Sequence, residues 1–255
     1  MLPALSVFRL WIYGHNKVHH GFTSFSPIDW IWRPLSPKEY NELNLLQKLL
    51  YRIERSMLTN AFHYFRRVWL QAMIRYNPGK NKQERRGYLA GKLYVLTYVT
   101  VASVLAYCFA GGLLGVLCVV VLPFVVFTYF ISTIVYLHHT HPDVPFFDLK
   151  TDWCHSIGLM YCSTIVRTSK LAQILLHNIM IHTPHHVDIR IPFYNLKAAY
   201  KDLKEHYGDY ITEYRFSWMK VARIFKKCKL YDFDNMRWLT YAEGRLALRE
   251  LSCAA

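Results

Sequence analysis

The chain has 255 residues, of which 53% are hydrophobic and 16% aromatic, and it carries a formal net charge of +14. This length suffices for one substantial domain or two small ones, and the positive charge fits either nucleic acid or an anionic membrane surface. A long apolar block without charged residues favours the membrane and argues against a nucleic-acid partner. The six cysteines form no CxxC pair, which argues against a disulfide framework and indicates free thiols in a reducing compartment.

The first notable element is a histidine cluster near the start of the chain, His15-Asn16-Lys17-Val18-His19-His20. On a helix, positions i and i+4 lie one turn apart, so His15 and His19 would point the same way, with His20 beside them. Imidazole is a good ligand for Zn, Cu, Fe and Ni. A single histidine is more often an ordinary core or surface residue, but two further clusters downstream favour a metal site.

The next region, Leu45–Met73, has apolar residues at helical spacing with lysines and arginines between them. This pattern predicts amphipathic helices that lie on the cytoplasmic leaflet of a membrane. An ordinary surface helix packed on its own domain stays open as the alternative.

The most apolar part of the chain runs from Leu93 to Leu137 and contains no Asp, Glu, Lys, Arg or His. A membrane-spanning helix needs about 20 apolar residues, so the block is long enough for two. Glycine favours turns, and Gly111-Gly112 divides the block into predicted helices Leu93–Ala110 and Leu113–Leu137. Pro123 is expected to kink the second helix, which a buried membrane helix tolerates.

The charges beside this block predict its orientation. Five basic residues precede it (Lys80, Lys82, Arg85, Arg86 and Lys92), whereas the Gly-Gly turn has none. The positive-inside rule therefore places the basic flank in the cytoplasm and the turn on the far side. Because two crossings return the chain to its starting side, all three histidine clusters are expected on the cytoplasmic face of a multi-pass integral membrane protein.

The other two histidine clusters follow the apolar block. His138-His139-Thr140-His141 comes directly after it, and His182-Thr183-Pro184-His185-His186 lies further along the chain. In the latter cluster three histidines have i, i+3 and i+4 spacing and would share one helix face, with Pro184 in the first turn, where its missing N–H does no harm. Grouped imidazoles beside a membrane predict a metal centre.

Five segments together carry a resemblance to the membrane fatty acid desaturase family, in particular to bacterial acyl-lipid desaturases of the omega-6 (Δ12) type. The cluster at His15–His20 resembles the family's second histidine box, and the cluster at His182–His186 resembles its third. The cluster at His138–His141 resembles the motif that closes the family's fourth membrane helix, and the flanks of the boxes also resemble those of the family. These segments are Trp11–His20, Trp32–Tyr40, Tyr136–Pro145, His177–His186 and Arg190–Leu196. The match implies a desaturase domain over residues 1–210, with the transmembrane hairpin at about 93–137, and a basic cytosolic tail over residues 211–255.

The resemblance implies an all-α integral membrane protein, in which a transmembrane helical hairpin and interfacial helices accompany a cytosolic helical cap with a His-rich di-iron site. Two non-haem iron ions, O2 and two external electrons would remove two hydrogens from a lipid acyl chain. No electron-transfer segment is fused to the chain, so a separate donor of ferredoxin or cytochrome b5 type is expected. The implied iron ligands are His15, His19, His20, His182, His185 and His186, with His139 or His141 as a further ligand. His177 and Asn178 would orient ligands or a bound water.

One departure from the family pattern affects the expected activity. The family's first box, H-x(3,4)-H, does not precede His15 in this sequence. We therefore expect an N-terminally truncated member, either as a fragment, an internal start or a split gene product, and a separate N-terminal fragment that carries the first box is a candidate partner. A degenerate member of the family is the alternative. Two alternatives stay open, namely a di-iron hydroxylase or ketolase, and an inactive fragment. The Arg190–Leu196 flank favours desaturation.

Overall fold

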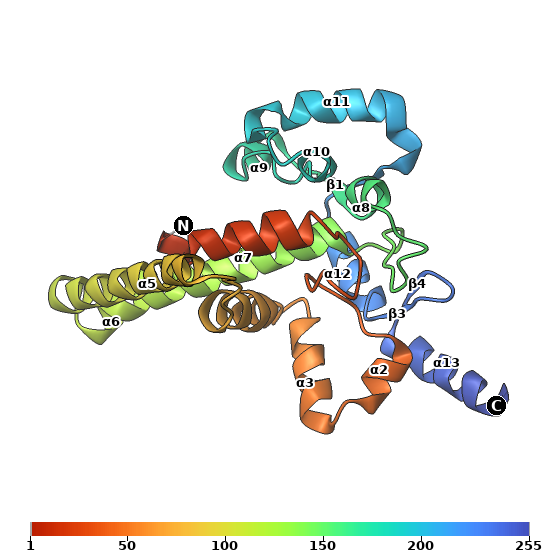
Figure 1. Cartoon of the computed structure of the whole chain (residues 1–255), viewed down its shortest axis with the longest axis horizontal. Coiled ribbons are helices and arrows are strands. Elements are labelled where there is room, and N and C mark those ends of the chain that lie inside the picture. The colour runs from red at the N-terminus through yellow and green to blue at the C-terminus, as the bar shows by residue number, and fades with distance from the viewer. Residues whose placement is uncertain (1, 255) are drawn as a thin grey trace. The chain divides into compact units, whose positions relative to one another are not determined.

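The computed structural model describes residues 2–254, and most of its secondary structure is helical (Figure 1). The chain divides into two compact units. We call Met1–Lys17 with Leu58–Thr133 the apolar-helix unit, and Val18–Met57 with Ile134–Ala255 the histidine unit. The largely helical structure agrees with the predicted class.

The apolar-helix unit is built on a hairpin in which α5 packs against α6 and η4. Its 3-10 and π-helical segments are labelled η, and two helices, η2 and α7, continue past the boundary of the unit. The elements are η1 (Leu2–Ala4), α1 (Phe8–Trp11), η2 (Ile12–His19), α4 (Ala61–His63), η3 (Tyr64–Arg75), α5 (Lys82–Phe109), α6 (Leu113–Val116), η4 (Leu117–Val121) and α7 (Leu122–His139).

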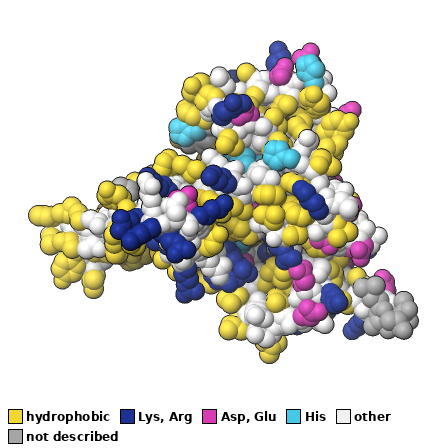
Figure 2. Space-filling view, viewed as in Figure 1, with side chains coloured by type: hydrophobic (Ala, Val, Ile, Leu, Met, Phe, Trp, Pro, Cys, Tyr) yellow, Lys and Arg dark blue, Asp and Glu magenta, His cyan; other side chains and the backbone are white. Residues whose placement is uncertain are grey.

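Both arms of the hairpin, Lys82–Phe109 and Leu113–His139, are long and apolar enough to cross a membrane, with 28 and 27 residues. Only 11% of the most apolar window of each arm is buried, so their hydrophobic side chains face outward. Figure 2 shows this hydrophobic surface, with lysines and arginines gathered beside it. The first arm begins earlier than predicted because the Asn81 side chain accepts a hydrogen bond from the Glu84 backbone N–H (2.9 Å) and caps the helix.

The predicted turn lies at Gly111 and Gly112, which have φ values of 92° and 66°. Glycine adopts this left-handed region without a steric penalty. In the second arm, Pro123 has no N–H to donate to the carbonyl of the preceding turn. The helix is widened into the π-helical η4, which ends at Val121, two residues before Pro123, and such a widening is a usual way of accommodating a break.

The predicted amphipathic helices of the region Leu45–Met73 are mainly α3 (Leu45–Glu54) and η3. Helix α3 begins with a capping box, in which Asn44 and Gln47 bond to each other's backbone N–H. It buries Tyr51 and Glu54, while Leu45 and Leu46 are 87% and 64% exposed. Its apolar face is thus exposed, as a helix on a membrane surface would require.

The histidine unit contains short helices and two small sheets. Strand β1 pairs with β2 in parallel, and β3 pairs with β4 in antiparallel orientation. The elements are α2 (Pro37–Glu42), α3, α8 (His155–Tyr161), β1 (Thr164–Arg167), α9 (Lys170–Leu175), α10 (Thr183–Val187), η5 (Phe193–Asn195), α11 (Leu196–Tyr207), η6 (Gly208–Tyr210), β2 (Thr212–Arg215), α12 (Trp218–Lys227), β3 (Leu230–Asp232), β4 (Arg237–Leu239) and α13 (Tyr241–Ala254). The all-α prediction did not include these strands.

An aromatic core holds the histidine unit together around the end of α7. The Tyr136 ring stacks on Phe225 with a centroid distance of 4.0 Å and meets the edge of Trp32 at 4.6 Å. The Tyr136 hydroxyl also donates a hydrogen bond to the Cys228 carbonyl (2.9 Å). The segment expected to be a basic tail, residues 211–255, therefore contributes β2, α12, β3 and β4 to the packing of this unit.

Candidate metal centre

The ends of three helices, η2, α7 and α10, carry the histidines of the candidate metal centre. His19 is the last residue of η2, and His139 is the last residue of α7. His182 is the N-cap of α10, which also carries His186. Pro184 lies in the first turn of α10, as predicted, where it leaves no backbone hydrogen bond unmade.

The imidazoles of these four histidines meet through their Nε2 atoms. The distance is 3.1 Å from His19 to His139, 3.2 Å from His139 to His182 and 3.1 Å from His182 to His186. All four side chains are buried, with at most 4% of their surface exposed. We call His19, His139, His182 and His186 the Nε2 cluster.

Hydrogen bonds on the outer side of the Nε2 cluster determine the tautomers. His19 Nδ1 lies 3.0 Å from Asp29 Oδ2, and His139 Nδ1 lies 2.9 Å from the Cys162 carbonyl oxygen. Both oxygens can only accept, so both Nδ1 atoms carry the proton and both Nε2 atoms carry a lone pair.

The Thr23 hydroxyl determines the tautomer of His186 in the same way. Thr23 Oγ1 donates to the His19 carbonyl (2.9 Å) and lies 3.1 Å from His186 Nδ1. Because the hydroxyl proton is already used, the oxygen accepts from His186 Nδ1–H. The Nε2 atoms of His19, His139 and His186 thus all present lone pairs to the same small space.

Burial keeps these imidazoles neutral. Burial, with a smaller contribution from His185, lowers the pKa of His19 to about 3. Burial, together with the surrounding histidines, also lowers the pKa of His182 and that of His186 well below the usual value. Near neutral pH His19, His182 and His186 are therefore uncharged, which is the form of imidazole that binds metal ions.

The arrangement fits a metal ion. The Nε2 lone pairs of His19 and His139 face each other across 3.1 Å and repel unless a cation lies between them. Two imidazoles bound to one ion, with bonds of about 2.0–2.1 Å, have their nitrogens at close to this separation. His19, His139 and His186 also offer ligand atoms that all lie within 4.8 Å of one another. We conclude that the residues present suit a metal with nitrogen ligands.

Two other predicted ligands lie beside the Nε2 cluster. The His20 ring stacks on His186 with a centroid distance of 4.1 Å and meets the edge of His185 at 4.7 Å. His15 belongs to the apolar-helix unit, where its ring stacks on Trp11 (5.0 Å) and its Nδ1 lies 2.9 Å from Asn16 Oδ1. The roles of His15, His20 and His185 as metal ligands stay predictions.

The two candidates for the additional ligand after the apolar block have different surroundings. His139 belongs to the Nε2 cluster, whereas His141 stacks on Tyr214 (4.9 Å) and its Nδ1 lies 3.4 Å from Asp143 Oδ2. The burial of His141 lowers its pKa, and this effect exceeds the opposing effect of Asp143. The geometry therefore favours His139.

His177 and Asn178 face a neighbouring loop. The His177 ring meets the edge of Phe193 (4.7 Å), and Asn178 Nδ2 donates to the Phe193 carbonyl (3.1 Å). Both residues have positive φ, 49° and 58°, so they form a tight turn that leads into the segment before α10. Their predicted role in orienting ligands stays a prediction.

Sequence reasoning assigned no role to four residues that the structure places at the centre. They are Thr23, Asp29, His138 and Cys162. His138 stacks on His182 with a centroid distance of 3.7 Å, and its position directly before His139 was the available signal. Thr23 lies in a turn four residues after His19, where η2 has already ended, so helical spacing does not predict its contact. Asp29 and the Cys162 carbonyl meet their partners only through the tertiary fold.

Comparison with known proteins places the chain in a family. The model of the fatty acid desaturase family matches residues 1–218. The chain is 28% identical over 249 residues to an sn-1 oleoyl-lipid 12-desaturase from Picosynechococcus sp., covering 95% of this chain and 68% of the relative.

Other relatives show the same similarity over a smaller share of their own length. An sn-1 oleoyl-lipid 12-desaturase from Anabaena variabilis is 26% identical, with 92% of this chain and 66% of the relative covered. A chloroplastic omega-6 fatty acid desaturase from Glycine max is also 26% identical, with 92% and 54% covered. The chain thus spans about two thirds of the cyanobacterial relatives and about half of the plant relative. Because the family model matches most of the chain, this protein belongs to the fatty acid desaturase family.

Proposed function

We propose that this protein is an acyl-lipid desaturase, which introduces a double bond into a membrane lipid acyl chain with O2, two electrons and non-haem iron. The observation that carries the proposal is the Nε2 cluster, in which four buried imidazoles bring their Nε2 atoms to within 3.1–3.2 Å of a neighbour. Membership of the desaturase family supports it. The names of the cyanobacterial relatives favour an oleoyl chain as substrate, with the new double bond at position 12.

The residues of the Nε2 cluster would hold one iron ion. His15, His20 and His185 are the further ligands proposed from the family pattern, for a centre of two iron ions. Bound there, iron would supply the oxidising power that an unactivated C–H bond requires. The protein contributes burial, which excludes water, and the outer hydrogen bonds from Asp29, Thr23 and Cys162, which hold the imidazoles in the binding tautomer.

The proposed reaction balances without any further reactant. Two adjacent CH2 groups each lose one hydrogen and form a C=C bond. These two hydrogens, two protons and two external electrons reduce one O2 to two molecules of water. The proposed electron source is a separate protein of ferredoxin or cytochrome b5 type. A polypeptide segment that carries the H-x(3,4)-H pair is the second proposed partner.

The proposal places α5 and the α6–α7 arm across the membrane, with the histidine-bearing ends on the cytoplasmic side. The length and composition of both arms support this. So do the basic residues at the start of α5 and the uncharged turn at Gly111-Gly112. An acyl chain in the bilayer and the end of α7 would then lie at the same membrane surface.

Expression in a host whose lipids are rich in oleoyl chains tests the function. We expect a new C18 fatty acid with double bonds at positions 9 and 12, measured by gas chromatography with mass spectrometry. The expression should be repeated with a segment that carries H-x(3,4)-H, and the control is His182→Ala in each setting. An unchanged fatty-acid profile in both settings, with the protein present in the membrane, would contradict the proposal. A hydroxylated product would instead support the hydroxylase alternative.

A further inference from the structure

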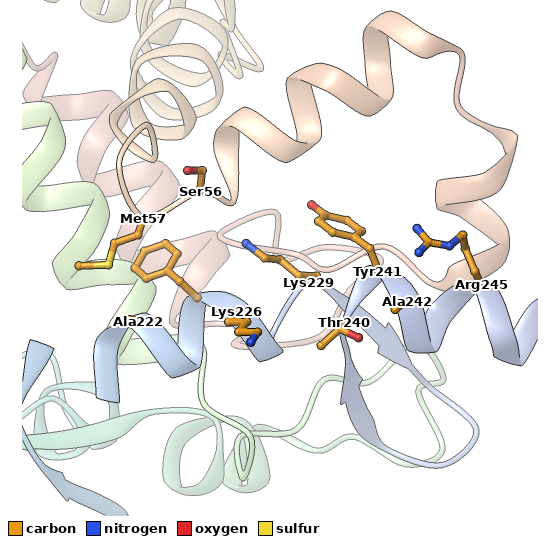
Figure 3. Close-up of a pocket in the computed structure, with 10 residues that line it drawn as sticks. Ser56, Met57, Ala222, Lys226, Lys229, Thr240, Tyr241, Ala242 and Arg245 are labelled. Carbon is orange, nitrogen blue, oxygen red and sulfur yellow. The ribbon is translucent and has the colours of Figure 1, made fainter. Parts of the chain in front are cut away.

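A second candidate site lies in the histidine unit, in a cavity of about 630 Å³ between α12, α13 and the segment after α3. Three cationic side chains line it (Lys226, Lys229 and Arg245), together with Tyr241 and the hydroxyl-bearing Ser56 and Thr240. In Figure 3 the Lys229 side chain extends toward Met57, and Tyr241 lies between Lys229 and Arg245.

The cavity has an excess of positive charge. No acidic side chain lines it, and among the described residues none of its three cations forms an ion pair with a carboxylate. The neighbouring acid, Glu243, is already engaged by Lys227 Nζ (2.7 Å) and by the backbone N–H of Thr240 (2.7 Å). Among the described residues, the lining of the cavity therefore carries an excess of positive charge.

A buried arginine next to the cavity adds to this excess. Arg55 is 2% exposed and donates to the Trp32 carbonyl (2.6 Å), with its guanidinium 5.2 Å from the centre of the Tyr51 ring. Its Nη1 has no hydrogen-bond partner among the described residues. Buried charges are usually paired with an opposite charge, whereas Arg55 has only rings and a carbonyl.

Lys229 connects Arg55 to the cavity. Its ammonium donates to the Arg55 carbonyl oxygen and lies 5.8 Å from the centre of the Tyr241 ring. Burial and the nearby Arg55 charge lower the pKa of Lys229 to about 8. Two cations in a partly desolvated place repel each other, and an anion in the cavity would relieve that repulsion.

We propose that this cavity binds a phosphate group. Phosphate suits it because a guanidinium can bind two phosphate oxygens at once and an ammonium acts as a compact charge beside them. The hydroxyls of Ser56 and Thr240 lie in the same lining, and Tyr241 with its apolar neighbours can contact the organic part of a phosphate ester. The headgroup of a lipid and a soluble phosphate are the two possible sources.

The test uses the full chain, purified into nanodiscs of phosphatidylcholine. One arm titrates inorganic phosphate and follows binding by 31P NMR. The other arm compares thermal unfolding in these nanodiscs with unfolding in nanodiscs that also contain phosphatidic acid. The variants are Lys229→Gln and Arg245→Gln, and the matched control is Lys197→Gln, which removes one charge from an exposed position of α11. Arg245 is also exposed, so its substitution is expected to leave the fold intact.

We expect saturable binding in at least one arm, weakened about 10-fold or more by Lys229→Gln and by Arg245→Gln and unchanged by Lys197→Gln. Stabilisation by phosphatidic acid that both variants lose identifies a lipid headgroup as the source. Binding of inorganic phosphate alone identifies a soluble phosphate. Absence of binding in both arms, or equal binding by the wild type and the two cavity variants, would overturn the proposal.

Discussion

At the scale of single residues, Asp29 determines which nitrogen of His19 faces the Nε2 cluster. Its carboxylate is buried and accepts hydrogen bonds from the backbone N–H groups of Ser24 (2.9 Å) and Ile31 (3.1 Å) as well as from His19 Nδ1. The two backbone bonds hold the carboxylate in place, so His19 is oriented by a rigid partner. A carboxylate outside the cluster thereby controls the geometry within it.

Substitution Asp29→Asn is expected to weaken metal binding by about 10–100-fold. An amide has one oxygen in place of two, and its NH2 group can donate to His19 Nδ1, which moves the ring proton to Nε2 and blocks the lone pair. The measurement is the affinity of purified protein for Fe(II) and Zn(II), obtained by competition with a chelator. Circular dichroism checks that the helices are retained.

The matched control for this substitution is Asp143→Asn. Asp143 has a side chain that is 75% exposed and lies near His141, outside the Nε2 cluster. We expect its metal affinity to equal that of the wild type. Equal affinities for Asp29→Asn and the wild type would show that Asp29 has no part in positioning His19, whereas a wild type that binds no metal would contradict the proposed function itself.

At the scale of elements, the hairpin depends on a turn that only glycine forms readily. Gly112 has φ 66° and ψ −136°, a combination that L-amino acids with a Cβ rarely adopt. A Cβ at this position would have its nearest neighbour, a Tyr107 ring atom, at 3.9 Å, which is an ordinary contact. Any cost of a side chain there is therefore a cost of backbone conformation.

Gly112→Ala is expected to destabilise the protein by about 1–3 kcal/mol, because the alanine backbone is strained at this φ and ψ. The measurement is the midpoint of thermal unfolding in detergent. The control is Gly208→Ala, since Gly208 has helical φ and ψ of −55° and −35° and a Cβ there meets Lys204 at 3.8 Å. Alanine at that position should be neutral or slightly stabilising, and equal midpoints for both variants would contradict the argument.

At the scale of the whole molecule, the membrane arrangement is the largest proposal and has a direct test. Two crossings require residues before and after the hairpin to lie on one side and the turn on the other. We expect single cysteines at Lys80 and Lys226 to react alike with a membrane-impermeant maleimide, and a cysteine at Ala110, beside the glycine turn, to react only from the opposite side. The background for these variants carries no native cysteine.

The outcome that would reject two crossings is labelling of Ala110→Cys from the same side as Lys80→Cys. Labelling of Lys226→Cys together with Ala110→Cys would indicate an odd number of crossings. Position Lys80 is exposed, and so are Ala110 and Lys226. Burial is therefore not expected to prevent labelling at any of these three positions.

Local patterns predicted the parts of the structure that depend on neighbours in the sequence. The Gly111-Gly112 turn and the placement of Pro184 in the first turn of α10 were confirmed, since each depends on the backbone of a few residues. The pairing of β1 with β2 was not predicted, because it joins short segments that are far apart in the chain. Asp29 and the Cys162 carbonyl were missed because their contacts with His19 and His139, 10 and 23 positions away, depend on how the intervening loops fold.

The origin of the Nε2 cluster in three distant stretches of chain has a consequence for biosynthesis. His19 and His139 are separated by 120 positions, and His139 and His182 by a further 43. A chain that emerges from the ribosome with its N-terminus first has released both apolar helices before residues 182–186 are made. Under the proposed function, metal loading would therefore be a late step in the maturation of this protein. An ion captured at that point would join the early, middle and late parts of the chain, so newly made protein deprived of metal should be the form most readily degraded.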